Sequence, residues 1–190
     1  MQEQRVILVN EQDEETGLME KMEAHRKGLL HRAFSVFVFD GEGRMLLQQR
    51  AASKYHGGLL WTNACCSHPY PGENVEDAAT RRLQEELGFN TPLQKIFSFT
   101  YKASVENGLI EYEYDHVFAG EYSGEMKLNS EEVAAVAYYA MNDIRVIMKE
   151  NPSLFTAWFK LAFPQVEGWW EERSKKTAEK EGMKGEMKAA

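Results

Sequence analysis

The sequence predicts one domain of the α/β class, either α+β or a mixed α/β/α sandwich. Segments typical of strands and of helices alternate irregularly, and hairpins take the place of strict β-α-β units. The chain has 190 residues, 43% of them hydrophobic and 12% aromatic, which is enough to form the core of one compact domain. We expect this domain to span residues 1–170, followed by a charged tail over 171–190 that is helical or disordered.

Apolar runs of strand length begin near the N-terminus and recur through the middle of the chain. The runs 34–39 and 45–49 flank a turn that begins with Asp40-Gly41, and this arrangement predicts a hairpin. The remaining predicted strands cover residues 5–10, 96–103, 110–119 and 133–140.

The clearest predicted helix covers residues 74–87. Its apolar residues recur at every fourth position and form one stripe, made of Val75, Ala79, Leu83 and Leu87. Asn74 is a suitable N-terminal cap, and Gly88 is suited to the position just after the last turn. We therefore expect this helix to pack one face against the core.

Two further helices are predicted toward the C-terminus. Asn142 or Asp143 is expected to cap a helix that runs to about Lys149. A second helix is expected to open at Pro152 and to end at Pro164, because proline suits a first turn and interrupts a helix interior. Its apolar positions have helical spacing: Leu154, Phe155, Trp158, Leu161 and Ala162.

The charge of the chain argues against two classes of partner. The formal net charge is −8 and the pI is near 5.2, whereas binding to nucleic acid or to an anionic membrane needs a basic surface. No stretch approaches the roughly 20 apolar residues that span a bilayer. The N-terminal segment also lacks a basic region followed by a long apolar core, so no signal peptide is evident.

The two cysteines, Cys65 and Cys66, are adjacent. Neighbouring Cα atoms lie about 3.8 Å apart, which is below the usual range for a disulfide. We therefore expect reduced thiols and a cytoplasmic location, and packing in the core is the simplest role for both thiols. The sequence leaves the choice between a monomer and a homodimer open.

Residues able to do chemistry gather in four places. Cys66 lies two residues before His68, which suits a nucleophile pair, a metal site or an acid, although a buried thiol in a turn explains it equally well. Glu111 and Glu113 are expected to share one face of a strand, where two carboxylates repel unless a cation lies between them.

The other two places are equally ambiguous when taken alone. His25 and His31 flank Gly28, and lone histidines are usually structural. The predicted helix presents possible surface ion pairs between Arg81, Arg82, Glu85 and Glu86. Taken together, however, three histidines and two facing carboxylates form a plausible octahedral cation site for Zn, Mn, Fe or Mg.

One string of residues resembles the Nudix box, G-x5-E-x7-R-E-U-x-E-E-x-G-U, where U is aliphatic. The matching positions are Ser67, Glu73, Arg81, Arg82, Leu83, Glu85, Glu86, Gly88 and Phe89. Ser67 replaces the first glycine, and Arg82 replaces a metal-binding glutamate. Because a guanidinium cannot bind a metal but suits a phosphate, this difference favours a Nudix scaffold used for other chemistry.

A longer pattern is similar to type 1 isopentenyl-diphosphate isomerase. It consists of the run W-T-N-x-C-C-S-H-P at 61–69, a G-E-x-x-E-D-A-x-x-R-R helix at 72–82, and the pair Glu111 and Glu113. The resemblance covers roughly residues 5–170. It implies a Nudix-like α/β/α sandwich with a mixed sheet and N-terminal additions, and isomerisation of isopentenyl diphosphate to dimethylallyl diphosphate in isoprenoid biosynthesis.

The resemblance also implies roles for individual residues. The implied ligands of a divalent Mg, Mn or Zn ion are His25, His31, His68, Glu111 and Glu113. Glu86 is implied to bind a second Mg ion together with the substrate diphosphate. The implied catalytic residues are Cys66, Glu113 and Tyr101. The implied substrate-binding residues are Lys21, Arg50, Lys54, Arg82 and Trp158.

These residue types suit the implied reaction. Moving a double bond requires one proton to be added and another removed, through a tertiary cation, and Cys66 and Glu113 are suited to the two transfers. Trp158 is suited to stabilising the cation with its π face, although core packing is the alternative. Two other functions stay open: a Nudix pyrophosphohydrolase, against which Arg82 argues, and a non-catalytic metal- or partner-binding module, which would not need Cys66 and Glu113 together.

Overall fold

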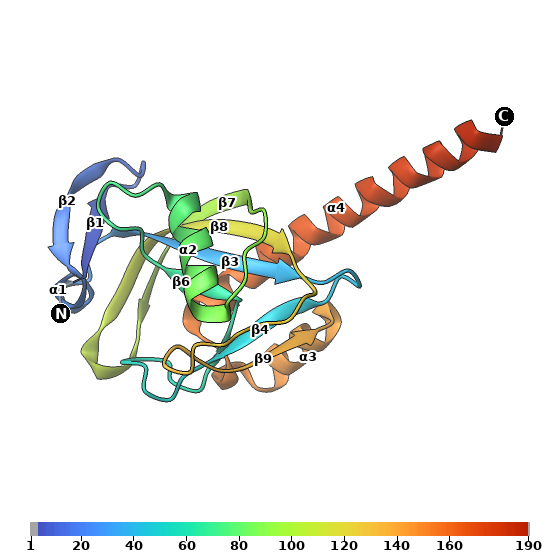
Figure 1. The fold of residues 1–190 in the computed structure, drawn as a ribbon. Coiled ribbons are helices and arrows are strands. Elements are labelled where there is room, and N and C mark those ends of the chain that lie inside the picture. Colours follow the sequence, from blue (N-terminus) through green and yellow to red (C-terminus); the bar gives the residue numbers. More distant parts are fainter. Residues whose placement is uncertain (1–3, 190) are drawn as a thin grey trace.

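The computed structural model describes residues 4–189, with side chains described as far as Lys176. One mixed sheet forms the centre of the molecule, and helices lie on both of its faces (Figure 1). The strands are β1 (Arg5–Val9), β2 (Glu15–Glu20), β3 (His31–Phe39), β4 (Met45–Arg50), β5 (Trp61–Thr62), β6 (Cys65–Ser67), β7 (Gln94–Ser104), β8 (Ile110–Glu121) and β9 (Val133–Tyr139). The helices are α1 (Lys21–Lys27), α2 (Val75–Leu87), α3 (Met141–Glu150) and α4 (Ala157–Ala189), with short 3-10 turns at Glu106–Gly108 and Pro152–Leu154.

Strand β3 is the centre of the sheet. It pairs in parallel with β8 over its whole length, from His31 opposite Glu113 to Phe39 opposite Glu121, and antiparallel with β6 and β1. Strand β8 pairs on its other side with β7, and β4 pairs with β9. The parallel register places His31 beside Glu113, although 82 positions separate them in the sequence numbering.

Alternation along β3 divides the core into two layers. Phe34, Val36 and Val38 are buried under α2, as the apolar stripe predicts, whereas Phe37 and Phe39 pack with the first turns of α4 on the other face. The predicted α/β/α sandwich with a mixed sheet is therefore confirmed.

Helix α2 has the predicted ends. The Asn74 side chain accepts hydrogen bonds from the backbone N–H groups of Glu76 and Asp77. Gly88 has a φ of 76°, and a Cβ atom there would lie 2.7 Å from Lys127, so only glycine fits this close approach. The second half of α2 and the two residues after it carry most of the residues that resemble the Nudix box, and Leu83 and Leu87 hold this part of the helix against the sheet.

The predicted hairpin is present but short, with β3 and β4 as antiparallel neighbours joined by the turn at Asp40. Strands β3 and β4 form a single pair, Phe39 opposite Met45, and then separate. Beyond this pair, each strand continues along a longer partner from a distant part of the sequence, β3 along β8 and β4 along β9.

The C-terminal helices also differ from the prediction. Ala140, rather than Asn142 or Asp143, occupies the cap position of α3, without a side-chain hydrogen bond. The segment after Pro152 makes only a 3-10 turn, because Phe155 is extended and pairs with Trp61.

Helix α4 begins at Ala157 and does not end at Pro164. Proline removes one backbone hydrogen bond from a helix. Phe159 and Phe163 before it, and Val166 after it, are buried in one layer of the core, so packing on both sides of Pro164 holds the helix together. The helix then continues away from the body of the molecule (Figure 1). No helix in the described part of the chain is long and apolar enough to cross a membrane.

The N-terminal additions are the β1–β2 hairpin and α1, of which β2 and α1 were not predicted. The side chain of Glu20 caps α1, and Gly28 ends it with a φ of 59°. Asp13, in the hairpin turn, holds this unit against the sheet: Arg32 Nε donates to its carboxylate at 2.7 Å, and His116 Nε2 lies 2.9 Å from it. This placement brings α1 to the end of the sheet where β3 and β8 begin.

Candidate active site

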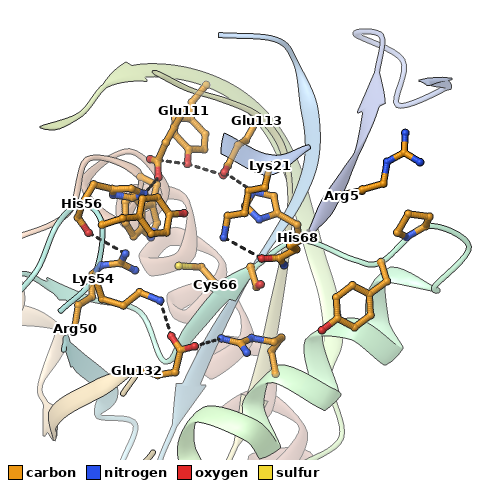
Figure 2. A pocket seen from close by; sticks show the side chains of 18 residues that line it. Arg5, Lys21, Arg50, Lys54, His56, Cys66, His68, Glu111, Glu113 and Glu132 are labelled. Atoms are coloured by element: carbon orange, nitrogen blue, oxygen red, sulfur yellow. Dashed lines mark hydrogen bonds and ion pairs between the residues drawn. The ribbon is translucent and has the colours of Figure 1, made fainter. Parts of the chain in front are cut away.

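A cavity of about 840 Å³ lies at the beginning of β3 and β8, closed on one side by the loop between β4 and β5. Acidic, basic and sulfur-containing side chains point into it together (Figure 2). Most of the residues that the sequence singled out line its wall: Lys21, Arg50, Lys54, Cys66, His68, Arg82, Tyr101, Glu111, Glu113 and Trp158.

Four of the five predicted metal ligands converge at one end of this cavity. His25, His31, His68 and Glu113 are buried, and one ligand atom from each lies within 4.8 Å of the others. They come from α1, the first residue of β3, the segment after β6, and β8. The parallel pairing of β3 with β8 and the docking of α1 therefore build this cluster from distant parts of the sequence.

The hydrogen bonds of the imidazoles fit a cation. His25 Nδ1 lies 2.7 Å from the carbonyl oxygen of Lys21, and His31 Nδ1 lies 2.8 Å from that of Leu29. A ring that donates from Nδ1 presents a lone pair at Nε2. His25 Nε2 is buried without a hydrogen-bond partner, and His31 Nε2 lies 3.2 Å from His68 Nε2. Burial lowers the pKa of His68 to about 3, so its ring is neutral, as a metal ligand must be.

Glu113 is the acidic member of this cluster. Its Oε1 lies 2.9 Å from His68 Nε2, and its Oε2 accepts from the Tyr101 hydroxyl at 2.6 Å. Burial acts to raise the pKa of Glu113, but the neighbouring rings of His31 and His68 outweigh it and hold the pKa well below its usual range. The donor set of imidazole nitrogens and one ionised carboxylate suits a divalent transition metal or Mg.

Glu111 lies outside the four-residue cluster. It shares the cavity-facing side of β8 with Glu113, as predicted, but its Oε1 lies 3.1 Å from His56 Nε2 and its Oε2 accepts from Tyr101 at 3.2 Å. Burial and the nearby charge of Glu113 raise the pKa of Glu111 well above its usual value. Tyr101 thus bridges the two carboxylates.

The adjacent cysteines lie on opposite faces of β6. Cys66 lines the cavity, whereas Cys65 is fully buried in the layer under α2. Burial raises the pKa of the Cys66 thiol, so the thiol keeps its proton at neutral pH. Figure 2 shows the Cys66 sulfur pointing into the cavity among Lys21, Arg50 and Lys54.

Basic side chains form the opposite part of the wall. Burial, with the charge of Lys54, lowers the pKa of Lys21 to about 8. Lys54 Nζ and Arg82 Nη2 both contact the Glu132 carboxylate, at 2.5 and 3.2 Å. Arg50 donates to the backbone carbonyl of His56. The cavity therefore holds a local cluster of cations in an otherwise acidic protein, a suitable environment for an anion such as a diphosphate.

Of the other predicted site residues, Glu86 differs from the expected arrangement and Trp158 does not. Glu86 is buried beside the cavity and does not line it: one oxygen accepts from Arg82 at 2.6 Å and the other from Gln48 at 3.1 Å. Trp158 does line the cavity, and Arg50 lies 5.1 Å from the centre of its ring. Its indole N–H donates to the side-chain oxygen of Asn63, which orients the ring.

Sequence reasoning missed several residues of the wall. Tyr55 and His56 belong to the loop after β4, and Glu132 precedes β9. A histidine or glutamate in a loop carries no periodic signal, so only its position in the fold reveals it. The nearby basic positions Arg50 and Lys54, which the resemblance marked, were the available indication for this loop.

The fold belongs to a known class of protein. Residues 29–159 match the NUDIX domain family. A crystal structure of a protein from Deinococcus radiodurans superposes with a TM-score of 0.66 at 18% identity, covering 78% of this chain and 90% of that one. The MutT protein from Methanosarcina mazei Go1 superposes with a TM-score of 0.61 at 16% identity, covering 77% and 96%. The chain is thus a Nudix-domain protein.

Sequence relatives narrow the class. "Isopentenyl-diphosphate Delta-isomerase 2" of Photorhabdus laumondii subsp. laumondii is 47% identical over 169 residues, covering 86% of this chain and 96% of its own length. "Isopentenyl-diphosphate Delta-isomerase" of Burkholderia multivorans is 49% identical over 157 residues, covering 83% and 89%. The chain belongs to this family of isopentenyl-diphosphate Delta-isomerases, which confirms the resemblance found in the sequence.

Proposed function

We infer that this enzyme isomerises isopentenyl diphosphate to dimethylallyl diphosphate. One proton is added to the terminal methylene of the substrate, which leaves a tertiary cation, and one proton is removed from the neighbouring CH₂ group, which re-forms the double bond. Two proton-transfer groups are therefore needed at one site. The observation that carries the proposal is that the Cys66 thiol and the Glu113 carboxylate line the same cavity.

Within this proposal, His25, His31, His68 and Glu113 hold a divalent cation, and Glu111 is its fifth ligand. The buried, unpartnered Nε2 of His25 and the neutral imidazole of His68 support the first part. A divalent cation bound there would tune the acidity of the Glu113 carboxylate. Mg, Mn and Zn all suit this mixed set of donors.

The diphosphate would be held by Lys21, Arg50, Lys54 and Arg82. Glu132 already forms ion pairs with Lys54 and Arg82 within the cavity, so a bound diphosphate would compete with this carboxylate for the same cations. We also propose that Glu86 binds a second Mg ion together with the diphosphate. This requires Glu86 to exchange its 2.6 Å contact with Arg82 for the ion.

The remaining parts of the wall would protect the reactive cation. Trp158 offers a π face, which already attracts the Arg50 guanidinium, and Tyr101 orients the two carboxylates. A closed and dry cavity would keep water from reacting with the cation. We also propose that residues 1–170 form a single domain, followed by the charged tail. The protein is proposed to be cytoplasmic and to be a monomer or a homodimer.

Conversion followed by NMR tests this function. With purified full-length protein and Mg or Mn, the signals of isopentenyl diphosphate should give way to those of dimethylallyl diphosphate, and chelation of the metal should stop the change. The competing pyrophosphohydrolase function predicts phosphate release from nucleoside diphosphate derivatives with no change in the C5 substrate. Metal binding without either reaction would point to a non-catalytic module.

A further inference from the structure

We propose that His56 is a positioning residue for the Glu111 carboxylate, and that it acts on the cation site through that carboxylate alone. The inference rests on the proposed function of Glu111 as a cation ligand. It concerns a loop residue that no sequence motif marked. The contacts of the His56 ring, of its loop and of Glu111 carry the inference.

The His56 ring faces Glu111 at short range. His56 Nε2 lies 3.1 Å from Glu111 Oε1, within hydrogen-bond distance, and both side chains are buried. The ring is fixed by its neighbours, since it stands edge-on to Tyr55 at 4.4 Å and to Trp158 at 5.9 Å between ring centres. An imidazole with little freedom to rotate can hold a carboxylate in one orientation.

The backbone around His56 is also held in place. The carbonyl oxygen of His56 accepts from Arg50 Nη2 at 3.0 Å. The next N–H, of Gly57, donates to the Glu106 carboxylate at 3.1 Å, and Asn107 donates to the carbonyl of Tyr55 at 2.8 Å. The loop is therefore tied to the 3-10 turn just before β8, the strand that carries Glu111.

The contacts of Glu111 explain why a donor is needed at this point. Tyr101 is the donor to Glu111 Oε2, but its hydroxyl is shared with Glu113 at a shorter distance, 2.6 against 3.2 Å. His56 is thus the neighbour at the other oxygen of Glu111 that is not shared with Glu113. Carboxylates that bind metals are commonly oriented by such hydrogen bonds, and their loss costs roughly tenfold or more in affinity.

Cation affinity tests this inference directly. Metal-stripped full-length protein would be titrated with Mn²⁺ against a competing chelator, and folding checked by circular dichroism. His56→Phe, which keeps a ring but removes the donor, should weaken Mn²⁺ binding about tenfold. His56→Gln, which restores an N–H donor, should recover part of the loss. His116→Phe is the matched control, because His116 is also a buried imidazole beside a carboxylate, Asp13, but lies outside the cavity wall.

A double-mutant cycle separates positioning from a general structural effect. In the Glu111→Gln background, His56→Phe should have no further effect on Mn²⁺ affinity, because the group that His56 positions has been changed. An equal loss in both backgrounds would overturn the inference, as would unchanged Mn²⁺ affinity of His56→Phe or an equal loss in His116→Phe. These readouts need no turnover, so the inference can stand or fail independently of the isomerase activity.

A second measurement avoids any change at His56. In metal-free protein, Glu111→Ala should shift the side-chain nitrogen resonances of His56, because it removes the oxygen 3.1 Å from Nε2. Unchanged resonances would show that the contact is not formed in solution and would overturn the proposal. This result stays decisive even if His56→Phe does not fold.

Discussion

Cys65 and Cys66, neighbours on β6, serve opposite sides of the sheet: Cys65 packs under α2, and Cys66 lines the cavity. Successive side chains of a strand point to opposite faces, so the pair can hold one structural and one reactive thiol. The Cys-x-His spacing selected Cys66, and the structure places that thiol beside the other cavity residues. The role of each thiol can be tested separately.

Cys66→Ala should abolish isomerisation and leave fold and metal content intact, because the thiol is proposed to transfer a proton and is not among the proposed cation ligands. Cys65→Ala should keep most of the activity and cost about 1 kcal/mol of stability, since it only removes a buried sulfur. Turnover, metal analysis and thermal unfolding of both variants check this. Equal loss of turnover in the two variants would mean that neither thiol has a specific role.

Tyr101→Phe should lower kcat by about tenfold or more with a smaller change in KM. Its hydroxyl bridges Glu111 and Glu113, and the variant keeps the ring that stacks on Phe99 at 5.5 Å. The measurement is steady-state kinetics with isopentenyl diphosphate. A wild-type kcat would show that the bridging hydrogen bonds do not organise the carboxylates for the reaction.

Arg82→Ala should raise KM for the substrate while the fold is retained, because Arg82 is proposed to bind the diphosphate. Arg82→Glu should raise KM further, since it places another carboxylate beside Glu86 and Glu132, which Arg82 now contacts at 2.6 and 3.2 Å. Unaltered isomerisation in Arg82→Glu would identify Arg82 as only an ion-pair partner, and the hydrolase function would then have to be assayed again.

The ion pair between Glu73 and Arg81 predicts how stability depends on pH. Hydrogen bonds from Arg81, at 2.7 and 2.8 Å, lower the pKa of Glu73 below its usual value. A lowered folded-state pKa contributes stability that is present above the unfolded-state pKa and is lost as the pH falls through the folded-state pKa. Glu73→Gln should therefore be less stable than wild type near pH 7, by less than about 1 kcal/mol because the pair is partly exposed.

Urea unfolding of wild type and Glu73→Gln at neutral and acidic pH measures this difference. The two proteins should converge in stability below the folded-state pKa of Glu73. A difference that stays constant with pH would show that the loss comes from packing and not from the charge. Glu76→Gln, at an exposed position in the first turn of α2, is the matched control.

The sequence predicted the parts of the fold that depend on local pattern. The α2 helix has a regular apolar stripe, an Asn74 cap and a Gly88 stop, and all three were found in place. The pairing of β3 with β8 could not be predicted in this way, because it depends on which distant strand best covers each apolar face. The predicted end of the helix at Pro164 was wrong, because packing overrides local helix propensity where the residues on both sides of a proline are buried.

The site was likewise predicted only in part. The resemblance marked His25, His31, His68 and Glu113, and the fold brings them within 4.8 Å of one another. The resemblance did not mark His56 or Glu132, because residues that meet across the cavity have no characteristic spacing in the sequence. Glu111 was predicted to face the same way as Glu113, and does so, but its contact with His56 could be seen only in three dimensions.

Deuterium exchange tests the central claim most directly. Wild-type protein with Mg or Mn would be incubated in heavy water with isopentenyl diphosphate, and both C5 diphosphates would be analysed by NMR and mass spectrometry. Protonation at one carbon and deprotonation at another predict dimethylallyl diphosphate that carries deuterium from the solvent, and none in the Cys66→Ala variant. Absence of solvent deuterium from both C5 diphosphates, with either metal, would contradict the isomerase function.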